Sequence, residues 1–122
     1  MGEGIDDRIR LALTLRELDV DSVPINILNA RLGTPLYGTP PLDPLEILLS
    51  IAIFRFLLPK KDIKICAGKE THLRQLIPLA IVAGCNSIMT GNYLTTLGRS
   101  PKLDKEVIED LGLTWQVPED EL

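Results

Sequence analysis

The chain has 122 residues, a length that suits one domain with one hydrophobic core. Hydrophobic residues make up 45% of the chain and aromatic residues 4%, which excludes a disordered protein and predicts a core of aliphatic side chains. The formal net charge is −4, and Lys and Arg are scattered along the chain. We therefore expect no nucleic acid as a main partner, because phosphate binding requires a basic face.

The cysteines and the apolar runs argue against two further classes of protein, disulfide scaffolds and membrane-spanning chains. Cys66 and Cys85 form no C-x-x-C motif, which favours buried thiols over a disulfide scaffold. The most apolar stretch, 45–58, is interrupted by polar residues and is shorter than the ~20 residues that a membrane span needs. We expect a soluble, cytoplasmic chain that makes no membrane contact.

The beginning of the chain predicts a helix and then a strand. Leucines recur at helical spacing over 6–19, after acidic residues that suit a helix N-terminus. The β-branched run 22–28 predicts a buried strand. Because side chains alternate along a strand, Asn26 lies opposite the aliphatic face, as a buried amide that needs a partner or a ligand.

A long loop and a well-marked helix follow. The loop at 29–42 contains three prolines and two glycines, and loops of this length are often functional. Asp43 is the expected helix cap, Pro44 suits the first turn, and Glu46 sits where the second member of a capping box lies. Pro59 ends this helix at about residue 58.

The rest of the chain alternates in the same way. We expect strands at 62–66 and 86–91 and a helix at 70–83, with a bend or a late start at Pro78. A last helix begins at Ser100 and ends at Gly112. This alternation predicts an α/β fold with parallel strands, either a small layered domain or part of a barrel. The domain is expected at 1–113, followed by an acidic, mobile tail at 114–122.

Polar side chains gather where the predicted strands end. Asn26 and Asn29 follow the first strand, Lys64 and Cys66 belong to the second, and 91–93 follows the third. Active sites of α/β sheets and barrels form beyond the carboxyl ends of parallel strands, so these residues form the candidate site. The structural alternatives stay open: a satisfied core amide, a lysine that extends to solvent, and a small buried thiol.

Four segments together resemble the C-terminal part of biotin synthase. They are D-R-I-R-L-A-L running into V-P-I-N (7–26), G-T-P-L (33–36), I-K-I-C-A-G-K-E (63–70), and A-G-C-N-S-I with G-N-Y-L-T-T (83–96). The resemblance extends over nearly all of the chain up to Leu113. It implies a radical S-adenosylmethionine enzyme on a TIM-type (β/α)8 barrel, which inserts sulfur into dethiobiotin in biotin biosynthesis.

By this resemblance the chain is a partial TIM-type (β/α) barrel, with about three parallel strands that alternate with four helices. The strands would be the sixth, seventh and eighth of the family's barrel. The family uses S-adenosylmethionine, a 4Fe–4S cluster on a C-x3-C-x2-C loop, and a second iron–sulfur cluster. That loop is absent from this sequence, and two cysteines cannot hold two clusters, so we expect the chain alone to hold no cofactor.

The resemblance also implies site residues. Asn26 matches the asparagine that binds the dethiobiotin ring, and Leu28 and Asn29 lie where the adenosyl part of the cofactor runs. Lys64 replaces an arginine that commonly ligates the second cluster, and lysine binds a metal only after it loses a proton. Cys66 stands where serine is common and is a further candidate metal ligand. No catalytic residue is expected within this chain.

Three functional hypotheses follow. The leading one is a C-terminal fragment or split subunit of biotin synthase that supplies the substrate-side wall, with an N-terminal half-barrel as its partner. The alternative is a non-catalytic α/β module that associates with a second copy of itself, because a partial barrel exposes strand edges. The third is a small enzyme that uses Lys64 and Cys66, although no general base accompanies them.

Overall fold

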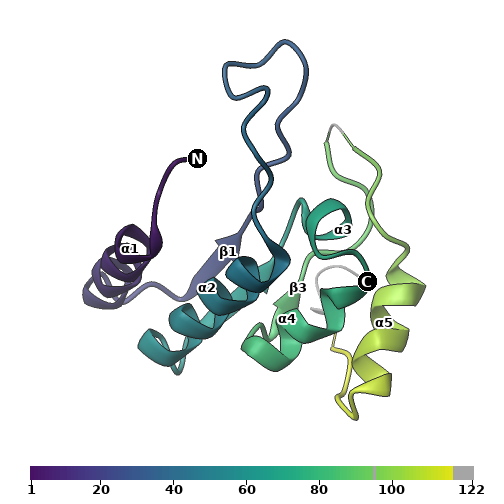
Figure 1. Cartoon of the computed structure of the whole chain (residues 1–122). Coiled ribbons are helices and arrows are strands. Elements are labelled where there is room, and N and C mark those ends of the chain that lie inside the picture. The colour runs from purple at the N-terminus through teal and green to yellow at the C-terminus, as the bar shows by residue number, and fades with distance from the viewer. Residues whose placement is uncertain (95, 117–122) are drawn as a thin grey trace. The chain divides into compact units, whose positions relative to one another are not determined.

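The computed structural model describes residues 1–94 and 96–116. The chain divides into two compact units, Met1–Met89 and Thr90–Leu122. The first unit contains most of the secondary structure (Figure 1): α1 (Ile5–Glu17), β1 (Ser22–Ile25), α2 (Pro44–Leu57), β2 (Asp62–Ile65), α3 (Lys69–His72), the 3-10 helix η1 (Arg74–Leu76), α4 (Ile77–Ala83) and β3 (Ser87–Ile88). The second unit contains α5 (Pro101–Asp110).

The three strands form one parallel sheet in the order β1-β2-β3. This confirms the α/β class and the three parallel strands. The described residues contain five α-helices instead of the expected four, because the helix predicted at 70–83 is divided into α3, η1 and α4. Pro78 explains the division, since it lies in the first turn of α4, where a missing N–H group costs no hydrogen bond.

The core lies between the sheet and the helices of the first unit. Ile63 and Ile65 of β2 are fully buried, whereas Lys64 between them is only half-buried. Helices α2 and α4 lie over this same face of the sheet (Figure 1). The side of α2 that faces the core is aliphatic and aromatic; it consists of Ile47, Ile51 and Phe54, and Leu58 directly after the helix is buried beside them. Aliphatic burial is therefore the main stabilising term of this unit.

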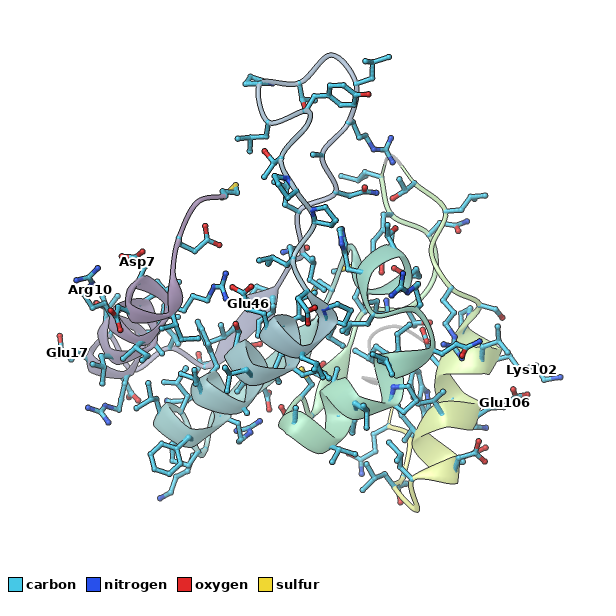
Figure 2. All side chains as sticks on the ribbon, viewed as in Figure 1. Asp7, Arg10, Glu17, Glu46, Lys102 and Glu106 are labelled. Carbon is cyan, nitrogen blue, oxygen red and sulfur yellow. The ribbon has the colours of Figure 1, made fainter. Side chains whose placement is uncertain are left out.

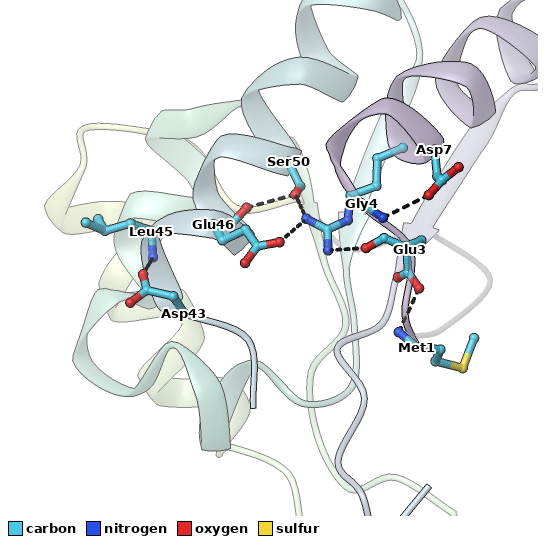
Figure 3. A network of polar contacts seen from close by, with 9 residues as sticks. Met1, Glu3, Gly4, Asp7, Asp43, Leu45, Glu46 and Ser50 are labelled. Carbon is cyan, nitrogen blue, oxygen red and sulfur yellow. Dashed lines mark hydrogen bonds and ion pairs between the residues drawn. The ribbon is translucent and has the colours of Figure 1, made fainter. Parts of the chain in front are cut away.

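Arg8 joins α1 to α2 through its guanidinium group. This group donates to Glu46 Oε1 at 2.8 Å, to Ser50 Oγ at 2.9 Å and to the Glu3 carbonyl at 3.3 Å (Figure 3). Asp43 caps α2 as expected and accepts from the Leu45 N–H at 2.7 Å. Glu46 is directed to Arg8, so the capping position in the sequence serves a contact between two helices.

Arg55 and Asn86 form a network of hydrogen bonds at the amino edge of the sheet, where the parallel strands begin. Asn86 Oδ1 accepts from the Ile63 N–H at 2.8 Å and from Arg55 at 3.0 Å. Arg55 also donates to four backbone carbonyls, those of Leu58, Pro59, Lys61 and Gly84. These bonds satisfy carbonyl groups at the ends of α2 and α4. The polar groups at this edge are thus used for stability.

The second unit contains α5, the last helix that the sequence predicts. Asp104 and Ile108 are its buried side chains, and Arg99 lies 3.4 Å from the Asp104 carboxylate. The acidic tail expected at 114–122 falls mostly outside the described residues, since 117–122 are not described. None of the helices in the described ranges is long and apolar enough to cross a membrane.

We predict that Arg8→Met lowers the free energy of unfolding by about 2 kcal/mol, because Glu46 and Ser50 lose a charged hydrogen-bond partner while the aliphatic bulk is kept. Arg10→Met is the matched control, since Arg10 pairs with Asp7 alone among the described residues, on the exposed side of α1 (Figure 2). The measurement is urea unfolding followed by circular dichroism. Equal losses in the two variants would contradict the role assigned to Arg8.

Candidate functional site at the carboxyl edge of the sheet

The carboxyl ends of β1 and β2 are joined by a short run of contacts that we call the edge junction (Asn26, Ile27, Ala67 and Gly68). The Ile27 N–H donates to the Ala67 carbonyl at 2.9 Å, and the Ala67 N–H donates to Asn26 Oδ1 at 3.2 Å. The edge junction therefore fixes the position of Asn26 relative to the end of β2.

Gly68 lies between β2 and α3 and makes the close approach of the two strand ends possible. Its φ is +89°, a conformation that favours glycine, and a Cβ at this position would lie 2.2 Å from the Ile27 carbonyl oxygen. The chain turns here into α3. The sequence predicted that the first strand reaches residue 28, but β1 ends at Ile25. The last residue of β2 that pairs with it is Ile65, after which the chain leaves the sheet towards α3.

Asn26 lies at this edge with its side chain exposed to solvent. The expectation of a buried amide was wrong, because nothing in the first unit covers this side of β1 in the way that helices cover the other side. Its Oδ1 is occupied by the Ala67 N–H. The Nδ2 group has no partner among the described residues, so Asn26 presents two N–H donors outward.

The sequence predicts that Lys64 lies on the same side of the sheet as Asn26. The strand register aligns Pro24, Lys64 and Ser87 in one row across the three strands. Asn26 lies two residues beyond Pro24, and alternation along a strand gives these two positions the same orientation. Asn26 itself lies one residue beyond the end of β1, so the sharing of one face by Asn26 and Lys64 remains a prediction.

Cys66 follows directly after β2 and is fully buried. Its Sγ donates to the Lys64 carbonyl at 3.7 Å. Burial raises the pKa of the Cys66 thiol, and the nearby Lys64 and Lys69 ammonium groups offset this only in part. A protonated, buried thiol is a poor nucleophile, so the hypothesis of a small enzyme based on Lys64 and Cys66 receives no support from this geometry.

Lys69 is a buried cation that the sequence interpretation missed. Its side chain is fully buried, and Nζ donates to the Met89 carbonyl at 2.6 Å and lies 3.0 Å from Glu70 Oε1. It thereby ties the start of α3 to the residue after β3. The sequence feature that could have indicated a role for Lys69 is its position directly after Gly68, near the carboxyl end of a predicted strand. His72, at the end of α3, is also buried.

The loop at 29–42 forms a pocket beyond β1. The loop extends away from the sheet (Figure 1), and the pocket has a volume of about 350 Å³. Its lining includes Leu28 and Asn29 together with further residues from the first half of the loop: Ala30, Arg31, Thr34, Pro35 and Leu36. This volume lies at the lower end of the range for small-molecule sites. Its wall is mostly apolar, and the Asn29 amide, Arg31 and Thr34 supply polar groups.

An iron–sulfur cluster needs several thiolate or other ligand side chains close together. The described residues contain no group of three or more His, Cys, Asp or Glu side chains that could hold a metal ion. Neither Cys66 nor Cys85 is in a disulfide, but both thiols are buried, and burial raises the pKa of Cys85 to about 12. The described residues therefore do not fit a cluster by themselves.

The loop expected to follow β3 belongs to the second unit. Within that unit the Tyr93 N–H donates to the Thr96 carbonyl at 2.9 Å, and the Gly91 N–H donates to the Arg99 carbonyl at 3.3 Å. Thr95, part of the Tyr-Leu-Thr-Thr segment, lies outside the described residues. The segment 91–93 is thus held in a turn of its own unit.

Comparison with known families identifies the chain. The model of the Biotin and Thiamin Synthesis associated domain matches residues 24–114, which include the second half of β1, all of β2 and β3, and α5. The chain belongs to this family. The matched region begins at Pro24 and contains the edge junction, the loop pocket and the row that holds Lys64.

Relatives of this Biotin and Thiamin Synthesis associated domain are named biotin synthase. The protein of Gloeothece citriformis is 53% identical over 113 residues, which are 93% of this chain and 32% of the relative. Those of Pelobacter propionicus and Geobacter sulfurreducens are 52% and 50% identical and are covered over 34% and 35% of their length. The chain thus spans about a third of the length of these relatives, and it corresponds to their C-terminal portion.

We predict that Gly68→Ala destabilises the domain by about 3 kcal/mol, because the new methyl group overlaps the Ile27 carbonyl and the backbone conformation is strained. Gly33→Ala is the control, since Gly33 also has a positive φ of +84° but has open space around it, and it should cost about 1 kcal/mol. Urea unfolding measures both changes. Equal costs would show that the close approach at the edge junction does not matter.

We predict that stability falls as the pH rises from about 9 towards 12. Over this range the unfolded chain has released the Cys85 proton while the folded chain keeps it, so a higher pH favours unfolding. Cys85→Ala removes this titration and should flatten the dependence, whatever its effect on stability at neutral pH. The measurement is the urea midpoint between about pH 8 and about pH 11. Parallel pH profiles for the two proteins would contradict the prediction.

Proposed function

We propose that this domain supplies the substrate-side wall of a biotin synthase, the enzyme that inserts sulfur into dethiobiotin. The family match and the relatives named biotin synthase support this activity. The observation that carries the assignment to a wall of the site is Asn26. Its amide is fixed at the carboxyl edge of parallel strands, where barrel enzymes bind their substrates.

The chemistry of Asn26 suits the ring of dethiobiotin. Because Oδ1 accepts from Ala67, the orientation of the amide is set before any ligand binds. The outward Nδ2 group then donates to an acceptor, and the ureido carbonyl oxygen of dethiobiotin is an acceptor of that kind. A donor that is already oriented loses little conformational entropy on binding.

We propose the loop pocket for the adenosyl part of S-adenosylmethionine. Leu28, Pro35 and Leu36 offer an apolar wall to a base or ribose face, and Asn29 offers an amide for polar atoms. The cofactor supplies the radical chemistry when it is bound. The part assigned to this chain is to hold the adenosyl group beside the edge that carries Asn26.

The cluster ligands of the proposed enzyme come from outside this chain. The ligand roles predicted for Lys64 and Cys66 remain predictions, since each side chain must lose a proton before it binds iron, and burial raises the pKa of the Cys66 thiol. We therefore propose an N-terminal half-barrel as the partner that brings both clusters, and we assign no step of the reaction to Lys64 or Cys66.

The test uses a chimera, in which this chain replaces the matching third of the Gloeothece citriformis biotin synthase. We predict that Asn26→Asp lowers kcat/KM for dethiobiotin at least about tenfold, because the carboxylate keeps the acceptor for Ala67 and loses the N–H donors. The measurement is biotin formation by the purified chimera with reconstituted clusters, together with calorimetric binding of dethiobiotin.

Two further variants make this test more specific. Asn26→Ala removes both functions of the amide and should lower stability as well as binding, whereas Asn26→Asp should lower binding alone. Gln75→Ala, an exposed change on η1, is the control and should leave both unchanged. Full activity and full binding in Asn26→Asp would overturn the assignment of Asn26 to the substrate.

A further inference from the structure

The turn after β2, the central strand of the sheet, contacts the neighbouring strand on both sides. On one side Ala67 and Gly68 form the edge junction with the end of β1, as described above. On the other side Lys69, the next residue, reaches the end of β3, where its Nζ donates to the Met89 carbonyl at 2.6 Å. Three consecutive residues of one turn therefore hold the carboxyl ends of both flanking strands.

Met89 is held through both of its backbone polar groups. Its N–H donates to the Ile65 carbonyl of β2 at 2.9 Å, one residue after the register pair of Ile65 and Ile88. Its carbonyl accepts from Lys69. Because β3 has two residues, fewer than most strands, its ladder bonds give little hold on its carboxyl end. The Lys69 bond thus extends the attachment of β3 to β2 beyond the strand itself.

Burial of the Lys69 side chain indicates that this bond has a use beyond stability. The side chain is fully buried, and the Glu70 carboxylate, itself 25% exposed, supplies the opposite charge at 3.0 Å. Replacement of a buried ion pair by apolar side chains of similar volume is often neutral or stabilising, so stability alone does not explain the lysine. Lysine differs from an apolar residue here in one respect, a directed hydrogen bond to one carbonyl at the carboxyl edge, where barrel enzymes bind their substrates.

We propose that Lys69 is a positioning residue of the substrate site. It fixes the carboxyl end of β3 relative to the edge junction, and it thereby sets the distance between the β3 side of the wall and Asn26. This inference rests on the proposed function, since it supplies the second side of the same wall. Because its side chain is fully buried, Lys69 acts through Met89 and not by contact with the substrate. A misplacement of about 1 Å in a site can cost a large factor in rate.

The first test measures the end of β3 in the full chain and requires no activity. Lys69→Met removes the donor and keeps most of the aliphatic volume. Exchange of the Met89 amide hydrogen, followed by NMR, is expected to become at least about tenfold faster, because the end of β3 opens more easily without a charged hydrogen bond. Amides inside α2 report global unfolding, and their exchange should change less than that of Met89.

Lys102→Met is the matched control for this measurement. Lys102 is an 83% exposed lysine on α5 with a single ion pair at 3.9 Å, so its removal should leave exchange at Met89 unchanged. Circular dichroism verifies that each variant is folded. Exchange at Met89 that Lys69→Met leaves unchanged, or that it accelerates only as much as exchange inside α2, overturns the proposal.

A second measurement uses the wild type and needs no folded variant. The Lys69 Nζ protons are expected to exchange with water slowly enough to give a separate signal in a heteronuclear NMR spectrum, with a coupling across the hydrogen bond to the Met89 carbonyl carbon. The other lysines are half-buried or exposed and should give no such coupling. A Lys69 ammonium group that exchanges as fast as the others overturns the proposal.

The third test uses the chimera with reconstituted clusters. Lys69→Met is expected to raise the KM for dethiobiotin at least about tenfold. It should leave the KM for S-adenosylmethionine unchanged, because the loop pocket lies beyond β1 and not beyond β3. Loss of folded enzyme alone would lower kcat and leave both KM values unchanged. Lys69→Arg keeps a charged donor and should restore part of the affinity for dethiobiotin.

The outcomes of the third test separate this inference from the proposed function. An active parent chimera whose KM for dethiobiotin is unchanged in Lys69→Met overturns the role of Lys69 and leaves the proposed function standing. An inactive parent chimera contradicts the proposed function, and amide exchange at Met89 then decides by itself whether Lys69 holds the end of β3.

Discussion

The contact between Gly68 and the Ile27 carbonyl is the constraint on which the carboxyl edge of the sheet depends. It allows Ala67 to exchange hydrogen bonds with both Ile27 and Asn26, and this exchange fixes the side-chain amide before any ligand is present. A residue with a side chain at position 68 would separate the strand ends. The candidate site is therefore positioned by backbone geometry more than by the packing of large side chains.

The two edges of the sheet serve different purposes. At the amino edge Arg55 and Asn86 satisfy carbonyl and N–H groups of the chain itself. At the carboxyl edge the outward donors of Asn26 and the pocket beside Asn29 are directed away from the core. This division agrees with the general placement of stability and chemistry in (β/α) barrels, and it supports the proposed wall of a biotin synthase site.

Local patterns in the sequence predicted the elements and their order, since the cap at Asp43 and the restart at Pro78 depend on neighbouring residues alone. Sequence patterns gave wrong predictions where the role or burial of a side chain depends on a residue far away in the sequence, or on whether another element covers one face of the sheet. Glu46 is directed to Arg8, which lies 38 residues earlier in the chain, and the exposure of Asn26 depends on what lies over the second face of the sheet. The burial of Lys69 likewise follows from tertiary contacts.

The central claim is that this domain can form the substrate-side wall of a working biotin synthase. The most direct measurement is growth without biotin of a bacterial strain that lacks its own biotin synthase and carries the chimera. The account predicts growth at a rate close to that given by the parent enzyme. Failure to grow, while the soluble chimera accumulates with both clusters in place, would contradict it.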